Sequence, residues 1–295
     1  MKVIVSAPAT TANLGPGYDC LGLALTLRST FTFETADDLL IEGCDEAFRG
    51  PDNLVLQGFQ EVWRQAGLEA PSVHLMIDAK IPVARGLGSS STCIVAGAAA
   101  ANAMLDNRFT LDELFQICST FEGHPDNAGP CIFGGLTASF KANGAEAFHA
   151  LPMPIASEWR FATVIPDYEV RTSIARKAMP HDITVADSVY TTSHAIAMLR
   201  ALATGDEVLL AEAAQDRLHE PCRCKLIPDW SVIREMAKNV GAAAFLISGS
   251  GSTLMALTKN ETVAHAFLAR VKAARPNFAT HLLRPSAKGV TVQKH

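Results

Sequence analysis

The sequence predicts an α+β protein that is divided into two domains. Segments with strand-like alternation and segments with helical periodicity follow one another without a strict strand–helix–strand order. A length of 295 residues is more than one hydrophobic core comfortably supports. The proline-punctuated stretch Leu151–Pro154 marks the expected boundary. We therefore expect an N-terminal domain over residues 1–153 and a C-terminal domain over residues 154–295.

Local patterns predict most of the individual elements. Alternating or β-branched residues indicate strands at 3–5, 31–33, 73–77, 136–140, 161–165, 244–247 and 253–257. Helical spacing of apolar residues indicates helices at 54–63, 93–104, 111–121, 186–204, 206–219 and 263–271. Residues 8–22 are polar, rich in glycine and contain two prolines, so we expect a long irregular stretch there.

Composition excludes several classes of function. The net charge is −5, which argues against the basic face that a nucleic-acid-binding protein needs. No apolar run approaches the length of a membrane span, and the apolar start at Val3–Val5 is too short for a signal peptide. The seven cysteines form no CxxC pair, which favours reduced thiols and a cytoplasmic location.

The chain is organised around the stretch Pro82–Thr92. Gly86 and Gly88 permit a tight turn, and the serines that follow lead into an alanine-rich helix. A glycine turn at a helix start presents free N–H groups and the positive end of the helix dipole, which is an anion site. The stretch lacks both the Walker A lysine and the third glycine of a Rossmann fingerprint. The alternative is a serine-capped helix after a glycine turn.

Four polar clusters, at 8–22, 82–92, 122–135 and 248–253, together resemble the signature of the GHMP kinases. These small-molecule kinases use a glycine-serine loop in place of a Walker A loop. Within that family, the motifs at 8–19, 122–127, 170–176 and 216–223 are most similar to the branch that phosphorylates homoserine. Departures from the family pattern occur at Arg171, Ile174, Ala128–Gly129 and Ser252, the last where many members carry proline.

The resemblance implies a two-domain GHMP-kinase-like fold with nucleotide and substrate sites between the domains. It also implies an activity, the transfer of the ATP γ-phosphoryl group to the hydroxyl of L-homoserine in threonine biosynthesis. A homodimer is a further expectation from the family. Two alternatives stay open: a GHMP kinase for another hydroxy substrate of the mevalonate or sugar type, and a sensor that binds nucleotide without turnover.

The same resemblance assigns the substrate-binding residues. Homoserine is a zwitterion with an extra hydroxyl, and arginine suits its carboxylate because the planar guanidinium binds in two-point fashion. Arg176 and Arg223 take that role, while Asp19 accepts from the ammonium group. The residues expected near the hydroxyl are Asn13, His124, Asn127 and Thr172. Taken singly, each of these has a plain alternative as a surface charge, a turn residue or a helix cap.

For ATP, the resemblance assigns the backbone of the glycine-serine loop to the triphosphate. That loop comprises Pro82, Val83, Ala84, Arg85, Gly86, Leu87, Gly88, Ser89, Ser90, Ser91 and Thr92. Asn53 matches a position that contacts adenine, although it also suits a helix cap. Ser90 and Glu122 match the Mg²⁺ ligands, although Glu122 also suits the last turn of a helix.

Phosphoryl transfer depends on positioning and charge neutralisation more than on covalent chemistry. The resemblance therefore gives Arg176 a catalytic as well as a binding role. Asp126 aligns with the carboxylate that acts as the base in related mevalonate kinases. The resemblance to the homoserine-phosphorylating branch implies instead that the hydroxyl proton passes to the phosphate, so Asp126 is a candidate base and no more.

Overall fold

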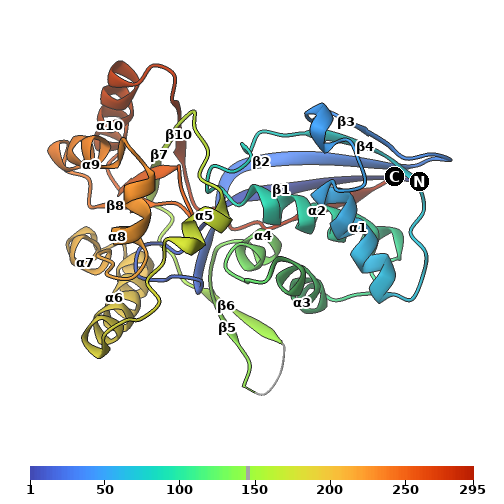
Figure 1. Ribbon diagram of the computed structural model, residues 1–295, viewed down its shortest axis with the longest axis horizontal. Helices are drawn as coiled ribbons and strands as arrows, with labels where there is room; N and C mark the ends of the chain where they lie inside the picture. Colours follow the sequence, from blue (N-terminus) through green and yellow to red (C-terminus); the bar gives the residue numbers. More distant parts are fainter. Residues whose placement is uncertain (144–146) are drawn as a thin grey trace.

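The computed structural model describes residues 1–143 and 147–295, and its elements form two β-sheets with helices packed on both (Figure 1). The larger sheet is built on the long antiparallel pair β1 (Lys2–Ala12) and β2 (Leu21–Thr35). Its strand order is β11-β1-β2-β4-β3, and β5 pairs with the start of β2. The remaining members are β3 (Leu40–Glu42), β4 (Val73–Asp78), β5 (Leu136–Lys141), β6 (Phe148–Met153) and β11 (Thr291–Lys294).

Four helices pack against the larger sheet: α1 (Leu54–Gln65), α2 (Ser89–Met104), α3 (Leu111–Glu122) and α4 (Ala128–Phe133). Helix α2 contacts β1 on one side and helices α1, α3 and α4 on others, and almost all of its residues are buried. A side chain at Gly97 would meet the carbonyl of Val55, so glycine lets α1 and α2 approach closely. This packing fixes the start of α2, at Ser89, against the sheet.

The smaller sheet has the order β10-β7-β9-β8, and all its pairs are antiparallel. Its strands are β7 (Arg160–Ile165), β8 (Ala244–Ile247), β9 (Leu254–Thr258) and β10 (Ala279–Leu283). Helices α9 (Trp230–Asn239) and α10 (Glu261–Ala274) share one hydrophobic core with this sheet. Helices α6 (Val185–Thr204) and α7 (Glu207–Ala213) contribute to a second core with it.

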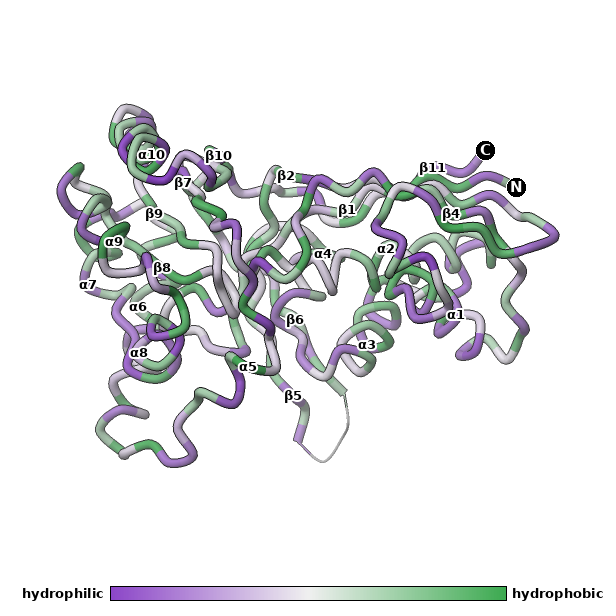
Figure 2. Tube along the Cα trace, turned by 45° about the horizontal axis from the view of Figure 1, so that its top comes forward, coloured by the Kyte–Doolittle hydropathy of each residue, from purple (hydrophilic) through white to green (hydrophobic). Residues whose placement is uncertain are grey.

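The two sheets share hydrophobic packing. One core cluster combines Leu14 and Leu23, from the first half of the chain, with Phe161 and Met255 of the smaller sheet. After β10 the chain returns to the larger sheet, where β11 pairs with β1, so the two termini lie side by side (Figure 2). The expected boundary at 153/154 falls between β6 and β7, where the chain passes from one sheet to the other. Because β11 rejoins the first sheet, the division by sequence position stays a prediction.

The α+β class is confirmed, and two local predictions were wrong. Residues 8–12 are not irregular, because β1 continues to Ala12 and accommodates Pro8 with a register shift between Pro8 and Thr10. The helix expected over 206–219 ends at Ala213. Asp216 then accepts hydrogen bonds from three backbone N–H groups, which bends the chain into the short helix α8 (Glu220–Arg223).

In the part of the chain that the structure describes, no helix is long and apolar enough to cross a membrane. The seven cysteines all lie among the described residues and are free thiols.

Candidate active site

Two glycine-rich loops are held together by hydrogen bonds where the two sheets meet. The first loop, residues 82–88, leads into α2, and the second, residues 248–253, connects β8 to β9. Ser248 Oγ donates to the carbonyl of Gly86 at 2.6 Å, and the Thr253 N–H donates to the carbonyl of Arg85 at 3.0 Å. A side chain at Gly86 would meet the carbonyl of Ser248. The approach of the loops therefore requires glycine at that position.

The N-terminus of α2 faces the space beside these loops. Gly88 precedes the helix with φ at +67°, and no side chain of the described residues caps the first turn. The N–H groups of that turn, with the positive end of the dipole, form an anion site. A cavity of about 370 Å³ adjoins it, with Ser89 and Ser90 at one side and apolar walls that include Phe48 and Ile81. A cavity with this lining suits a ligand that has a flat apolar part and an anionic part.

Asn53 lines the same cavity and is also the cap of α1. Its Oδ1 accepts from the Val55 N–H at 2.9 Å, and its Nδ2 donates to the carbonyl of Phe48 at 2.7 Å. The side chain thus shapes the cavity wall by holding two segments. Arg85 also acts away from the loop, because its guanidinium donates to the carbonyls of Pro166 and Asp167.

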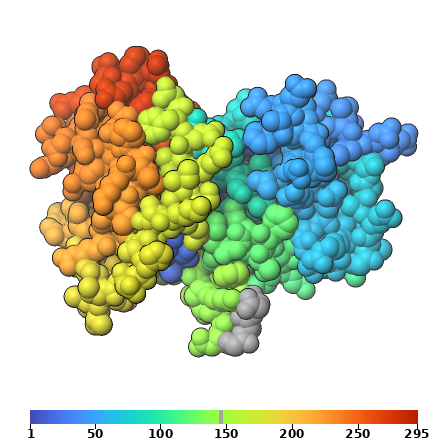
Figure 3. Space-filling model, viewed as in Figure 1, coloured from blue at the N-terminus to red at the C-terminus, as the bar shows by residue number. Residues whose placement is uncertain are grey.

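On the other side of the loops, Asp19 and Arg176 form a two-point ion pair. Asp19 comes from the turn between β1 and β2, and Arg176 comes from α5 (Thr172–Lys177). Arg176 Nη1 and Nη2 donate to the two carboxylate oxygens at 2.9 and 3.0 Å. The segment that carries α5 lies along the boundary between the two lobes of the molecule (Figure 3). The expected ammonium acceptor and one expected carboxylate clamp therefore neutralise each other.

Arg223 lies beside this pair in a different environment. It is buried, and its Nη1 donates to the carbonyl of Gly249 at 2.8 Å while its Nε lacks a partner among the described residues. Burial lowers its pKa, and its guanidinium lies 5.0 Å from the centre of the Tyr18 ring. Asn13 Nδ2 donates to the same Gly249 carbonyl at 2.9 Å, and Asn13 Oδ1 accepts from the Asp19 N–H.

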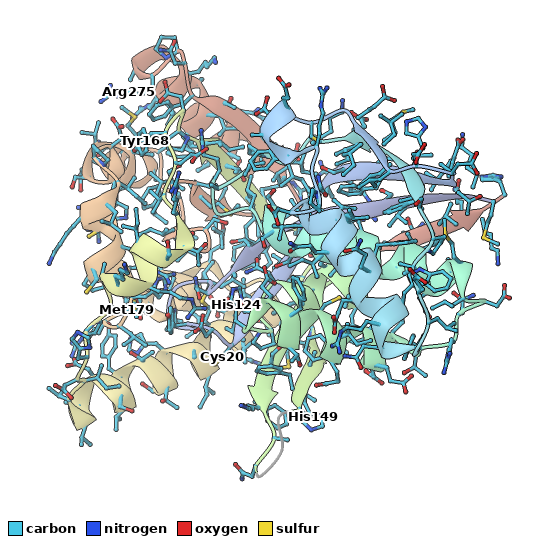
Figure 4. All side chains as sticks on the ribbon, turned by 45° about the vertical axis from the view of Figure 1, so that its right-hand side comes forward. Cys20, His124, His149, Tyr168, Met179 and Arg275 are labelled. Carbon is cyan, nitrogen blue, oxygen red and sulfur yellow. The ribbon has the colours of Figure 1, made fainter. Side chains whose placement is uncertain are left out.

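A third group links His124, Asp126 and Asn127. His124 Nδ1 donates to Asp126 Oδ1 at 2.8 Å, and Asn127 Oδ1 accepts from Thr10 Oγ1 at 2.7 Å. Burial opposes the charged form of His124, but the hydrogen bond and charge of Asp126 outweigh it, so the pKa of His124 is raised. Figure 4 labels His124 near the middle of the molecule, between the layers of the two halves. This group can hold both a positive and a negative charge close to the start of α2.

Glu122 ends α3 and faces the first turn of α2. Ser91 Oγ donates a short hydrogen bond to its carboxylate. Burial raises the pKa of Glu122, while His124 and hydrogen bonds from Ser91 and Ser90 oppose that shift. The carboxylate thus lies beside the anion site at the helix start, together with both serine hydroxyls.

Comparison with known proteins identifies the family. The GHMP kinase N-terminal domain model matches residues 53–135, and the GHMP kinase C-terminal model matches residues 198–277. A homoserine kinase of Thermosynechococcus vestitus is 40% identical over 261 residues, which cover 87% of this chain and 86% of the relative. The chain belongs to the GHMP kinase family. It is therefore an ATP-dependent kinase, as the sequence motifs predict.

Solved structures agree with this assignment to the GHMP kinases. A homoserine kinase of Cytophaga hutchinsonii has a TM-score of 0.88 at 25% identity, and the match covers 99% of this chain and 97% of that one. A mevalonate kinase of L. major, in complex with R-mevalonate, has a TM-score of 0.74 at 14% identity, covering 96% of each chain. The second likeness concerns the fold alone.

The geometry of this GHMP kinase brings most of the predicted residues together. Asn13, Asp19, Arg176 and Arg223 meet through their contacts with one another, with Gly249 or with Tyr18, whereas Asn53 and Thr172 lie on the cavity side. Thr172 Oγ1 also lies 3.4 Å from Ser250 Oγ.

Sequence reasoning missed some residues with clear contacts. Tyr18 accepts a hydrogen bond from Arg176 at 3.3 Å and lies under Arg223. Ser91 was assigned only to the phosphate loop, but it donates to Glu122 as Ser90, the predicted Mg²⁺ ligand, also does. Both lie within the quoted motifs, but only the fold reveals which side of each segment faces the site.

Proposed function

We propose that this GHMP kinase transfers the γ-phosphoryl group of ATP to the hydroxyl of L-homoserine, giving O-phospho-L-homoserine, a step of threonine biosynthesis. Relatives named homoserine kinase match about nine-tenths of the chain, at 37–40% identity. The observation that carries the proposal is the Asp19–Arg176 pair beside an uncapped helix start.

The charge pair favours a zwitterionic substrate over the alternatives. When an amino acid enters, its carboxylate replaces Asp19 at Arg176 and its ammonium group replaces Arg176 at Asp19. Both protein charges therefore stay paired. A polyol offers no charge to either side chain, and a hydroxy acid of the mevalonate type offers no cation to Asp19, so each makes fewer charge-assisted contacts than a zwitterion does. Arg223 adds a second cation that Asp19 does not satisfy.

The nucleotide side is proposed to hold ATP through its backbone. The base would occupy the 370 Å³ cavity, and the phosphates would take the N–H groups at the start of α2. Arg85 and Asn53 keep the walls of this site in place through their hydrogen bonds with the protein. Their role is to position the loop and the cavity.

Glu122, Ser90 and Ser91 fit a magnesium site. Residues 1–143 and 147–295 contain no group of three His, Cys, Asp or Glu side chains that would hold a metal by themselves. Mg²⁺ commonly takes one or two protein oxygens and completes its shell with water and phosphates, so a single carboxylate beside an anion site suits it. When bound, Mg²⁺ supplies positive charge against the phosphates. Glu122 would be its carboxylate ligand.

His124, Asp126 and Asn127 are proposed to orient the substrate hydroxyl. Asp126 is buried and already accepts from His124, so its first role is to fix the orientation of the imidazole and to raise its pKa. The hydroxyl proton would pass to a phosphate oxygen. If Asp126 were the obligatory base, Asp126→Asn would abolish turnover, whereas an orienting role predicts a partial loss.

An ADP-release assay over matched substrates tests the proposal. The panel contains L-homoserine, 3-aminopropan-1-ol without the carboxylate, 4-hydroxybutanoate without the ammonium group, mevalonate and galactose. We expect kcat/KM for homoserine to exceed every other by at least about a hundredfold, since each charge-assisted contact is worth roughly 1.5–3 kcal/mol. Preference for mevalonate or galactose, or nucleotide binding without turnover, would overturn the assignment.

A further inference from the structure

A second cavity, of about 410 Å³, lies outside the candidate active site. Its lining comes from residues 214–224, between α7 and the end of α8, and from residues 230–245 on α9 and β8. Trp230 and Phe245 form aromatic walls, with their ring centres 6.4 Å apart. A concave space of this size with aromatic walls suits a small organic ligand.

The charges around the cavity favour an anion. Arg234 and Lys238, four residues apart on α9, both line it, and neither forms an ion pair with a carboxylate among the described residues. Burial raises the pKa of Glu220 to about 8, so at neutral pH this carboxyl largely keeps its proton. Asp216 also lines the cavity, but its carboxyl oxygens already accept hydrogen bonds from three backbone N–H groups. Two cations therefore remain for a ligand.

Trp230 supplies a second independent feature. Its indole Nε1 is buried and has no hydrogen-bond partner within residues 1–143 and 147–295. The Arg234 guanidinium lies 5.0 Å from the centre of the indole ring. A flat ligand against this wall would meet both an aromatic surface and the cation above it.

Helix α8 separates this cavity from the active site and contacts both. On the cavity side, Glu220 Oε1 accepts from the Ile247 N–H at 2.8 Å, directly before the second glycine-rich loop. On the opposite side, Arg223 holds the Gly249 carbonyl and His219 Nε2 donates to the carbonyl of Gly15 at 2.7 Å. A shift of α8 would therefore move both loops that carry the substrate site.

We propose that this second cavity binds a small organic carboxylate with a flat apolar body, and that occupancy changes substrate affinity through α8. The carboxylate is held by Arg234 and Lys238, and the apolar body packs against the wall that the edge-to-face pair of Trp230 and Phe245 forms. The binding step is independent of the proposed function, whereas the effect on homoserine rests on it.

Benzoate is the first probe, and benzamide is its uncharged counterpart of the same shape. We expect calorimetry to give roughly millimolar benzoate affinity, as befits so small a ligand, with benzamide at least about fivefold weaker. Arg234→Gln and Lys238→Gln should each weaken benzoate binding by about fivefold or more. Arg270→Gln, on the exposed surface of α10, is the matched control and should change nothing. No saturable benzoate binding, or equal binding by all three variants, overturns the site.

The coupling is tested with the wild-type enzyme and both ligands. Saturating benzoate should change the KM for homoserine by at least about twofold, and homoserine should change the benzoate Kd by a similar factor when binding is at equilibrium. Benzoate binding without either change overturns the role of α8 and leaves the cavity as an isolated site. If homoserine is not phosphorylated, the benzoate titrations alone decide the binding step, so the two failures are distinguishable.

Discussion

The two sides of the candidate active site use different chemical groups. The nucleotide side consists mainly of backbone: Gly86 and Gly88, the N–H groups at the start of α2, and carbonyls of one glycine-rich loop that accept hydrogen bonds from the other. The substrate side consists of charged side chains from α5, α8 and two loops. The backbone of the nucleotide side should therefore be most sensitive to added side-chain volume, and the substrate side should be most sensitive to the geometry of its charged contacts.

The two arginines of the substrate side also differ. Arg176 is part-exposed and pairs with Asp19, whereas Arg223 is buried and bonds a backbone carbonyl. Breaking the Arg176 pair costs little stability because solvent reaches it, whereas Arg223 is embedded in the fold. Arg176 can therefore exchange Asp19 for the substrate carboxylate, whereas Arg223 would hold the substrate and the loop carbonyl of Gly249 at the same time.

The largest effect is expected from Gly88→Val, which tests the volume rule. Valine strains the backbone at φ +67°, and its Cβ would meet Thr10 Oγ1 and lie 2.9 Å from Asn127 Oδ1. We expect ATP affinity, measured by equilibrium titration, to fall by at least about a hundredfold. Gly67→Val is the control, since Gly67 has φ +72° but open space around it. Unchanged ATP affinity in folded Gly88→Val enzyme would refute the loop assignment.

Glu122→Gln tests whether the nucleotide side depends on the negative charge of the Glu122 carboxylate, which lies beside the first turn of α2. The substitution keeps the shape and the contact with Ser91 but removes the negative charge. We expect turnover to fall roughly a hundredfold and the Mg²⁺ requirement to rise, with homoserine binding little changed. The measurement is kcat as a function of Mg²⁺ concentration. A Mg²⁺ dependence equal to that of the wild type would leave Glu122 as a helix-end residue.

Arg176→Lys tests the geometry of the charged contacts on the substrate side. Lysine keeps the charge but loses the two-point geometry, so kcat/KM for homoserine should fall roughly ten- to a hundredfold. For 3-aminopropan-1-ol, which has no carboxylate, the loss should be much smaller. ATP affinity without homoserine should not change. Equal losses for the two substrates would mean that Arg176 serves the phosphate or the fold.

Arg223→Lys separates the two arginines. The same loss with homoserine is expected, but thermal stability should also fall, because the Gly249 carbonyl loses a buried donor. Arg176→Lys should keep the wild-type melting temperature. Equal melting temperatures for the two variants would contradict the claim that burial gives Arg223, but not Arg176, a role in stability.

The last prediction concerns stability as a function of pH, not activity, and involves Glu220. Burial raises its pKa from 4.5 to about 8, so the unfolded chain loses this proton at lower pH than the folded protein does. Ionisation therefore favours unfolding, and wild-type stability should fall as pH rises from about 5 to 8, by at most roughly 1.4 kcal/mol per pH unit. Glu220→Gln should lack this decline in denaturant titrations, whereas exposed Glu212→Gln should retain it. If the stability of Glu220→Gln and that of the wild type changed in parallel with pH, burial would not have raised the pKa of Glu220.

Local sequence patterns predicted much of this molecule. The helix predicted over 111–121 is α3, which ends at Glu122 because Gly123 adopts φ +84° directly after it. The alanine-rich helix and the glycine turn before it were also predicted, because helix propensity and the preference of glycine for tight turns depend on only a few neighbouring residues. The family motifs named the candidate site residues because each motif is a short local segment.

Only the tertiary structure decided how those segments meet. Asp19 and Arg176 are 157 residues apart, and their pairing depends on two sheets packing through one shared core. Whether Asp216 prolongs a helix or bends it, and which serines of α2 reach Glu122, depends on neighbours distant in sequence. Burial of Arg223 and Glu220, which sets their pKa values, likewise comes from contacts across the fold. Residue types and local geometry are thus encoded along the chain, whereas partners and desolvation arise only when distant segments pack together.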